Sequence, residues 1–495
     1  MRTSKSLLQS MFILGLIAIT ATSAFAETHS QKTHLTPRAV GVNLPMEKSI
    51  WHEYAYQKLD LYGGHKVRSH FDVTPFYQAS TDKHDTGAYF GIGKGNGFQV
   101  AKAADVPAHG DIVGGYLIHN RDDQGEDASL LAGKVTFDPK QDIWGVRLDF
   151  FQDIDHPYKN LFFRASMPIV YVQNDMGMEI KDGTPVTFGS TEFSLADFFA
   201  GNVEVTEAMD AYNQQSALTK GKINGKRSKV GLGDIELGLG YKFHQTKKSH
   251  LFLSLGLTVP VEEESRGEYL FDAVTGNGNH VGLGVRMDSG VQIWENKHAA
   301  VRALFDLDYH YLFSATEDRT VTPKSSITSG FMSQYYLAGF KDQTGKALFP
   351  AANILTRGVR VEPGSQLEAM LALSFKSGGF VIDLGYDFYY KDEEKAWIKG
   401  WQDGMYGISA TDYDASIAFD ANQTIGGFLT KDDLNVESAK TPSQTTHKIF
   451  AGLGYQFNIV KKCPALAAIG GSYEFAQDNS ALEQYALWLK LGISF

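Results

Sequence analysis

The chain has 495 residues, of which 43% are hydrophobic, 12% aromatic and 21% charged, with 50 Gly and a single Cys. This composition excludes a disordered chain, a coiled coil and a collagen-like rod, and the many Gly, Tyr and Phe favour β structure. A net charge of −11 argues against a nucleic-acid partner, because phosphate binding needs a basic surface. The lone Cys463 cannot form an internal disulfide.

The first 26 residues predict a signal peptide. Arg2 and Lys5 give a basic start, residues 11–20 form a short apolar core, and Ala24-Phe25-Ala26 has the small-x-small pattern of a cleavage site. We therefore expect cleavage between Ala26 and Glu27 and an exported protein; an uncleaved N-terminal anchor is the alternative. The apolar core is too short for a spanning helix.

From about residue 130 onward, the chain is a series of segments that alternate between apolar and polar residues. In 299–313 the odd positions are apolar and the positions between them include Arg302, Asp306 and Asp308. Side chains of a strand point alternately to opposite faces, so such a segment has one apolar and one charged face. The candidate strands are 130–138, 142–152, 160–172, 229–243, 250–260, 280–293, 298–313, 366–376, 379–390, 446–459, 464–475 and 481–495.

A soluble β-sandwich also has alternating strands, but the length of these segments favours a membrane barrel. They run about 11 to 15 residues, whereas soluble strands run about 5 to 6 and a bilayer-crossing strand about 9 to 11. Backbone groups in lipid must be paired, so spanning strands have to close on themselves. The sequence therefore predicts an all-β fold, a transmembrane antiparallel β-barrel.

The gaps between the candidate strands alternate in length. Those after residues 152, 243, 293, 376 and 459 are short, and those at 173–228, 261–279, 314–365 and 391–445 are mostly long. Short periplasmic turns and long extracellular loops are typical of outer-membrane barrels. We therefore expect the cell outer membrane as the location and a periplasmic C-terminus.

The N-terminal region leaves the strand count open. Residues 66–77 alternate, and an even count then requires one more strand, at 86–93 or 111–119. About fourteen strands is the preferred count, and twelve with an N-terminal plug is the alternative. The expected organisation is a signal peptide over 1–26, a periplasmic or plug segment over 27–65 and a barrel over 66–495.

Two segments resemble known families. The last strand, Tyr485-Ala-Leu-Trp-Leu-Lys-Leu-Gly-Ile-Ser-Phe495, resembles the assembly signal of Gram-negative outer-membrane barrels, which implies recognition of Phe495 by the barrel insertion machinery. The segment Gly231-Leu-Gly-Asp-Ile-Glu-Leu-Gly-Leu-Gly-Tyr241 is similar to a hairpin of barrels grouped as phenol-degradation-pathway transporters, relatives of the long-chain fatty-acid transporters. That similarity implies transport of hydrophobic compounds.

The polar face of the strands carries many charges. A dry core could not hold them unless nearly all were paired, whereas a water-filled or partly plugged lumen can. The alternative is that they form cross-strand ion pairs that stiffen the wall. Because the signs are mixed, we expect at most mild ion selectivity. The predicted pore-lining residues are Arg147, Arg164, Asp234, Glu236, Arg286, Asp288, Arg302, Asp306, Asp308, Asp383, Asp387 and Lys448.

One long loop has its own hydrophobic pattern. Residues 191–218 contain several Phe and Val followed by helix formers, which predicts a short helix or a packed cap. A self-packed surface loop is the preferred interpretation, and a site that meets a hydrophobic solute is the alternative.

No catalytic or metal motif is present in the sequence. His298, His310 and His447 do not form a spaced pair such as HExxH, and there is no GxSxG turn. We expect no enzyme activity, no cofactor and no metal. The expected partners are membrane lipid, lipopolysaccharide and a small solute, and the oligomeric state stays open.

The preferred functional hypothesis is an outer-membrane channel for passive diffusion of small solutes through a polar lumen. One alternative is a transporter of hydrophobic compounds of the fatty-acid-transporter type. The other is a surface-exposed structural or adhesive barrel with a closed lumen.

Overall fold

The structure is a computed structural model. It describes residues 28–39, 43–51, 69–81, 84–101, 112–119, 131–154, 159–210, 213–261, 265–328, 331–343, 347–410, 417–460 and 463–495. The predicted signal peptide, with Ala26 and Glu27, lies outside the described residues, as do residues 52–65 of the predicted plug segment and residues 66–68 of the predicted barrel.

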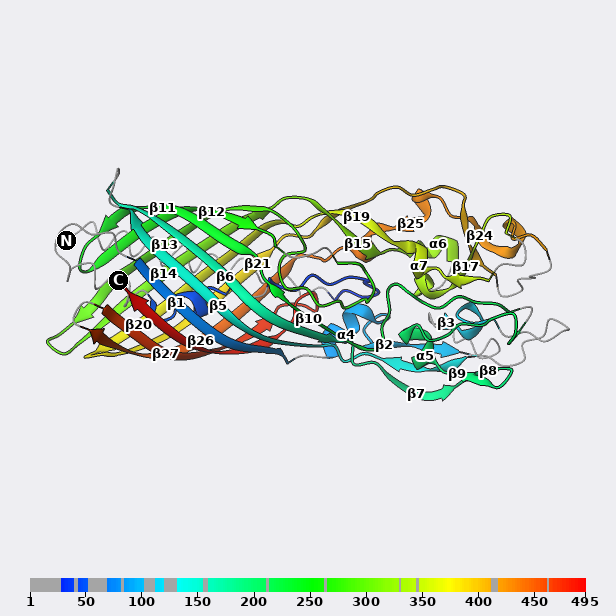
Figure 1. The fold of residues 1–495 in the computed structure, drawn as a ribbon, viewed down its shortest axis with the longest axis horizontal. Helices are drawn as coiled ribbons and strands as arrows, with labels where there is room; N and C mark the ends of the chain where they lie inside the picture. Colours follow the sequence, from blue (N-terminus) through cyan, green and yellow to red (C-terminus); the bar gives the residue numbers. More distant parts are fainter. Residues whose placement is uncertain are drawn as a thin grey trace.

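Twelve antiparallel strands form a closed barrel (Figure 1). Each strand is hydrogen-bonded to the next, and β28 closes the ring by pairing with β1. Closure leaves no free sheet edge in the membrane. The strands, in order around the wall, are β1 (Ser69–Ser80), β5 (Lys140–Ile154), β6 (Leu161–Asp175), β11 (Ile235–Gln245), β12 (Ser249–Val259), β13 (Gly282–Glu295), β14 (Ala299–Leu312), β20 (Gly364–Ser377), β21 (Phe380–Lys391), β26 (Gln444–Val460), β27 (Cys463–Ala476) and β28 (Gln484–Ser494).

The preferred count of fourteen strands is wrong, and the alternative of twelve holds. The predicted strand at 130–138 is β4 (Ala132–Thr136), which pairs outside the barrel with β2 (Gly97–Ala101) and β7 (Glu179–Thr184). Five residues are too few to cross a bilayer. Of the other two candidates, 86–93 falls largely in α4 (His84–Phe90), and the described part of the second, 112–119, holds the two-residue β3 (Ile112–Val113) and a 3-10 turn at Gly114–Tyr116.

One barrel strand is interrupted. β10 (Lys226–Leu232) and β11 both pair with β6, and the two residues between them, Gly233 and Asp234, shift the register by one. The break lies beside Pro168 of β6, whose carbonyl accepts from the Gly233 N–H at 2.8 Å. Proline has no N–H to donate, so a sheet tolerates it only where the ladder is irregular.

Alternation along each strand separates a lipid face from a lumen face. In β14, Asp306 and Asp308 are 1% and 2% exposed, whereas Tyr309 is 37% exposed on the opposite face. Tyr241, Trp294 and Tyr455 lie outside near the short turns, and other outward aromatic residues lie near the long loops, as in the girdles of membrane barrels. The protein is an outer-membrane β-barrel whose outward apolar side chains face lipid.

The C-terminal strand closes the wall with its last residue. Phe495 exchanges two backbone hydrogen bonds with Ser69, at 2.8 and 3.0 Å, and its side chain is 64% exposed. The C-terminus lies at the end of the barrel opposite the long loops (Figure 1). Recognition of Phe495 by the insertion machinery stays a prediction.

The long loops fold together into a domain at one end of the barrel (Figure 1), which is called the extracellular domain below because the long loops of outer-membrane barrels are expected to face the cell exterior. Its elements are the sheets β3-β2-β4-β7, β15-β19-β22 and β18-β17-β23-β24, the pairs β8-β9 and β16-β25, and short helices. Their bounds are β8 (Val186–Phe188), β9 (Thr191–Phe193), β15 (Ala315–Thr320), β16 (Thr322–Pro323), β17 (Leu337–Phe340), β18 (Phe349–Pro350), β19 (Thr356–Glu362), β22 (Lys395–Ile398), β23 (Tyr406–Ser409), β24 (Thr424–Phe428), β25 (Leu434–Asn435), α5 (Leu195–Ala200), α6 (Ser325–Thr328) and α7 (Ala352–Leu355).

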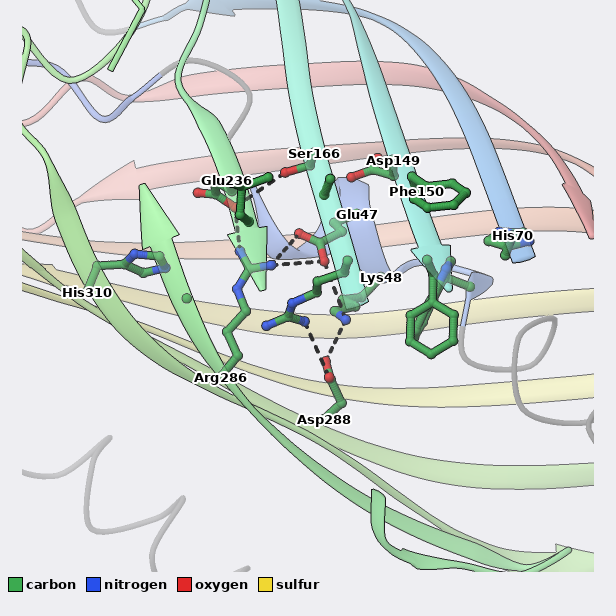
Figure 2. Close-up of a pocket in the computed structure, with 16 residues that line it drawn as sticks. Glu47, Lys48, His70, Asp149, Phe150, Ser166, Glu236, Arg286, Asp288 and His310 are labelled. Atoms are coloured by element: carbon green, nitrogen blue, oxygen red, sulfur yellow. Dashed lines mark hydrogen bonds and ion pairs between the residues drawn. The ribbon is translucent and has the colours of Figure 1, made fainter. Parts of the chain in front are cut away.

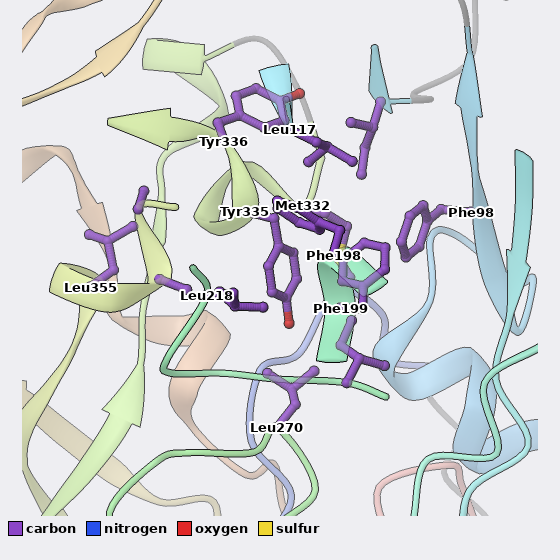
Figure 3. Close-up of a cluster of buried hydrophobic side chains, with 14 of the residues drawn as sticks. Phe98, Leu117, Phe198, Phe199, Leu218, Leu270, Met332, Tyr335, Tyr336 and Leu355 are labelled. Atoms are coloured by element: carbon purple, nitrogen blue, oxygen red, sulfur yellow. The ribbon is translucent and has the colours of Figure 1, made fainter. Parts of the chain in front are cut away.

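This domain has its own hydrophobic core, shown in Figure 3. Phe198 and Phe199 of α5 are buried in it. The ring of Phe199 packs edge to face on Tyr335, with 5.2 Å between the ring centres. The predicted short helix in 191–218 is therefore present and packed under the other loops. Of the residues described, none belongs to a helix long and apolar enough to cross a bilayer.

The facing of the strands can be tested at one adjacent pair of residues. Replacing Leu307, which faces lipid, with Arg should destabilise the barrel by about 2 to 4 kcal/mol at mid-membrane depth, measured by urea unfolding in lipid vesicles. Its neighbour Asp306 faces the lumen, where its carboxylate accepts from the Ser289 N–H at 3.1 Å. Asp306→Asn keeps an acceptor there and should be tolerated. Equal effects of the two substitutions would contradict the assigned facing.

Candidate functional site

The N-terminal segment runs through the lumen from the loop end toward the turn end. His29 and Gln31 are hydrogen-bonded to Asn479 and Gly91 at the loop end, whereas Trp51 packs on Phe151 near the turn end. The described parts of this segment, residues 28–39 and 43–51, are called the inner segment below. Most of its residues from Asn43 onward are buried.

A single helical turn, α2 (Leu44–Lys48), forms the centre of the inner segment. Asn43 caps it by accepting from the Met46 N–H at 3.3 Å, and Pro45 stands in its first turn, where a missing N–H costs nothing. The turn presents Leu44 and Met46 to apolar lumen residues and Glu47 and Lys48 to charged ones.

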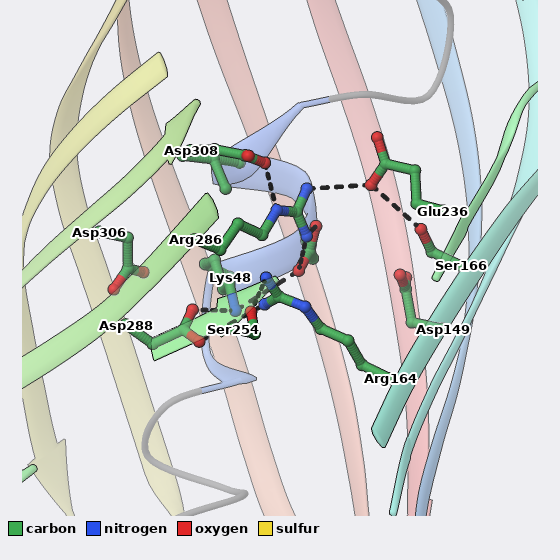
Figure 4. A network of polar contacts seen from close by, with 12 residues as sticks. Lys48, Asp149, Arg164, Ser166, Glu236, Ser254, Arg286, Asp288, Asp306 and Asp308 are labelled. Carbon is green, nitrogen blue, oxygen red and sulfur yellow. Dashed lines mark hydrogen bonds and ion pairs between the residues drawn. The ribbon is translucent and has the colours of Figure 1, made fainter. Parts of the chain in front are cut away.

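The carboxylate of Glu47 joins two separate strands of the wall; Figure 2 shows it beside Arg286, and Figure 4 shows Arg286 between Asp308 and Glu236. Arg147 of β5 donates to it at 2.7 Å, and Arg286 of β13 donates to both of its oxygens at 3.1 and 3.2 Å. Arg286 also donates to Glu236 of β11 at 2.9 Å and to Asp308 of β14. One guanidinium thus holds three carboxylates, two from the wall and one from the inner segment.

Lys48 and Lys490 fix the same turn from other sides. The Lys48 ammonium lies 2.5 Å from Asp288, which also pairs with Arg164 at 3.4 Å. Lys490 of β28 donates to the carbonyl oxygens of Glu47 and Ser49, at 2.6 and 3.0 Å. Buried charges are stable only when they are paired. The wall and the inner segment each supply counter-charges and hydrogen-bond partners to the other.

An apolar layer borders this network. Leu44 and Met46 are buried with Phe76, Phe450 and Trp488 of the wall. Gly470 makes room for one of these rings, because a Cβ there would lie 2.4 Å from the Trp488 indole.

The part of the inner segment nearer the loop end is held by a second charged cluster. Arg38 pairs with Glu368 of β20, with Glu474 of β27 at 3.1 Å and with Asp387 of β21 at 3.8 Å. Its guanidinium carbon lies 4.4 Å from the centre of the Tyr389 ring. This set of three carboxylates and one ring is called the Arg38 pocket below.

The extracellular domain holds the segment through a third cluster. Thr36 donates to Glu394 at 2.8 Å, and Arg319 pairs with Glu394 and with Glu317 at 2.9 Å. Burial alone would raise the pKa of the Glu317 carboxyl, but Arg319 and His280 lower it to about 2. Glu317 therefore stays ionised and keeps Arg319 in place.

Little space remains in the lumen beside α2. The cavity there has a volume of about 40 Å³ and is lined by Glu47, Lys48, Arg164, Asp288 and His310 among others. Such a space holds only a few water molecules. At this level the inner segment and the side chains that bind it occupy much of the lumen.

The twelve predicted pore-lining residues all lie on the inner side of the wall, but they do not form one site. Arg147, Arg164, Glu236, Arg286, Asp288 and Asp308 belong to the Glu47–Lys48 network, and Asp387 and Lys448 adjoin Arg38. Asp383 accepts from the Ile50 N–H at 2.6 Å. The other three contact the wall and its turns: Asp234 binds Asn277, Asp306 binds Ser289 and Arg302 donates to the Lys247 carbonyl.

The sequence did not point to the residues of the inner segment. Arg38, Glu47 and Lys48 lie before the first strand, where no alternating pattern assigns a side chain to the lumen. Glu474 and Lys490 do occupy polar positions of predicted strands, so alternation could have identified them. No group of His, Cys, Asp and Glu in the described ranges is arranged to hold a metal ion.

No protein-family model and no curated protein matches the sequence. Among solved structures, it is similar to an outer-membrane channel from Pseudomonas putida F1, with 12% identity, 88% of this chain and 98% of that chain covered, and a TM-score of 0.36. It is also similar to the toluene transporter TodX of Pseudomonas putida (10% identity, 96% and 99% covered, TM-score 0.32) and to a FadL homologue of Pseudomonas aeruginosa (8%, 87% and 90%, TM-score 0.26).

The contribution of the Glu47–Lys48 network to the free energy of unfolding can be measured by substituting Arg286. Arg286→Met should destabilise the folded barrel by about 3 to 5 kcal/mol, because it leaves buried carboxylates without their cation. Arg360→Met, at an exposed position where the guanidinium donates to the Ser314 hydroxyl, should change stability by less than about 0.5 kcal/mol. Urea unfolding in lipid vesicles compares the two. Similar values would show that the lumen charges are solvated and not paired.

Proposed function

We propose that the protein is an outer-membrane channel for small solutes whose own N-terminal segment holds the lumen closed. The observation that carries this proposal is the placement of α2 across the lumen, with a cavity of only about 40 Å³ beside it. The closure is non-covalent, since ion pairs and backbone hydrogen bonds hold the segment to the wall. A segment held by non-covalent contacts alone can leave its position in the lumen and bind there again.

The wall behind the segment is suited to a watery path. Once Glu47 and Lys48 moved away, Arg147, Arg286 and Asp288 would each lose one counter-ion and keep another from the wall, and water would have to solvate the vacated side of each ion, because partly unpaired ions are costly in a dry interior. Their side chains would then line a polar passage for passive diffusion. Both signs of charge are present on this part of the wall, which favours mild ion selectivity.

A second candidate function, transport of hydrophobic compounds, is favoured by a recess on the outer wall. It has a volume of about 1130 Å³, and its lining includes outward side chains such as Trp144, Ile169, Val230 and Leu487. A compound dissolved in the membrane could lie there. The lining of the recess also includes Phe76, Val170 and Trp488, which are buried with Leu44 and Met46 in the lumen, but the strands β28, β1, β5 and β6 between the recess and the lumen are hydrogen-bonded to one another. Uptake of a hydrophobic dye into vesicles by a barrel without ionic conductance would favour this second function.

Neutralising the two charges of α2 should open the channel. Glu47→Gln weakens the contacts to Arg147 and Arg286, and Lys48→Gln weakens the contact to Asp288. We expect the double variant in planar bilayers to open at least about tenfold more often than the wild type, which corresponds to about 1.4 kcal/mol.

Lys395→Gln is the matched control, because it removes an exposed pair with Glu362 in the extracellular domain. It should leave the opening frequency unchanged. A folded double variant that conducts no better than the wild type would contradict the proposal and favour a closed structural barrel.

A further inference from the structure

The Arg38 pocket is built to surround a cation. Glu368, Asp387 and Glu474 come from three strands of the wall and are each buried, with side chains at most 4% exposed. Tyr389 adds the face of a ring, which attracts a cation electrostatically. Carboxylates around a planar guanidinium and an aromatic face below it form a recognition arrangement that suits organic cations.

The pocket is acidic once Arg38 is set aside. Its three carboxylates then have one wall cation, Lys448, at 3.2 Å from Glu474 and 3.6 Å from Asp387. The fully buried Asp387 carboxylate accepts no hydrogen bond from a nitrogen donor of the described residues, and its nearest charged neighbours are Lys448 at 3.6 Å, Arg38 at 3.8 Å and the Glu368 carboxyl group. Asp387 therefore retains capacity to accept from a donor that enters the pocket.

The Glu47 network differs in this respect. If Glu47 moved away, Arg147 would keep Asp149 at 2.8 Å, and Arg286 would keep Glu236 and Asp308. The wall there carries its own counter-charges and creates no vacancy for an anion. Of these two clusters of described residues, the Arg38 pocket is the one that would be left with an excess of one sign.

We propose that the Arg38 pocket is a recognition site for an organic cation that carries a guanidinium or primary ammonium group. In the closed barrel Arg38 occupies the site, and a cationic solute takes its place when the inner segment moves. Opening the channel thereby leaves the buried carboxylates paired if such a solute is present. The role in passage rests on the proposed function, whereas binding to the pocket does not.

The position of the pocket fits recognition of an incoming solute. Glu474 lies two residues before the loop end of β27, and the inner segment above Arg38 contacts the extracellular domain at Thr36 and Thr33. A solute that entered from the loop end would meet this site before the apolar layer around Leu44 and the Glu47 network.

The Arg38 pocket can be tested by removing the Arg38 guanidinium and adding a small soluble guanidinium compound in its place. Arg38→Ala removes the guanidinium, and ethylguanidinium should then bind in its place, whereas the uncharged ethylurea of similar shape should not. We expect ethylguanidinium at millimolar concentration to raise the melting temperature of the purified, detergent-solubilised Arg38→Ala barrel saturably. Asp387→Asn in the same background should weaken the apparent affinity at least about fivefold.

Arg302→Ala is the matched control, because Arg302 faces the lumen near the turn end and donates to the Lys247 carbonyl. It should show no ethylguanidinium-dependent shift. If Arg38→Ala does not fold alone, its refolding yield with each compound becomes the readout, and a higher yield with ethylguanidinium only supports the site. Equal effects of ethylguanidinium and ethylurea would overturn the proposal. These readouts need no conduction, so they separate failure of the pocket from failure of the channel.

Discussion

The ion pair between Glu47 and Arg286 is the contact on which the interior of this barrel depends. Arg286 is buried in the lumen and binds three carboxylates. Two of them belong to wall strands, and the third, Glu47, belongs to the inner segment. The cost of burying charge explains this arrangement, because an ion removed from water is stable only with a counter-ion and hydrogen bonds. The wall therefore needs either the inner segment or water, and these two alternatives correspond to a closed and an open lumen.

The two ends of the inner segment have different surroundings. Around Arg38 the wall supplies mostly carboxylates, whereas around Glu47 it supplies both arginines and carboxylates. Departure of the segment would therefore leave a charge excess at one level of the lumen and not at the other. Between these levels, Leu44 and Met46 fill an apolar layer. The segment thus matches the wall at each level it crosses.

The barrel strands could be predicted from the sequence because one physical rule, alternation between lipid and lumen, acts on every residue of them. Eleven of the twelve candidate strands, together with 66–77, correspond to barrel strands within a few residues. The candidate at 130–138 failed because Val135 and Phe137 are buried in the core of the extracellular domain, where a short alternating strand has the same pattern. Alternation alone does not distinguish lipid from a protein core.

The sequence analysis included a plug over residues 27–65 as an alternative, but it could not identify which residues of that segment contact the wall, for a related reason. Arg38, Glu47 and Lys48 acquire their role from long-range pairing with strands about a hundred or more residues away, and a five-residue helical turn leaves no periodic signal. The wall residues of the same site were predictable as inward-facing charges. Their contacts were not predictable, since alternation specifies the face of the strand on which a side chain lies and not the residue that it contacts.

The central claim is that movement of the inner segment opens the lumen, and a disulfide can test it directly. A Cβ at Gly452 would lie 3.5 Å from the Cβ of Ser49, within the range of native disulfides. Ser49→Cys with Gly452→Cys would therefore tie the segment to β26, in a barrel that also carries Glu47→Gln and in which Cys463→Ser removes the native thiol. Single-channel recording should show a silent barrel when oxidised and openings after reduction, with either single cysteine unaffected. Equal conductance in the oxidised and reduced states would contradict the account.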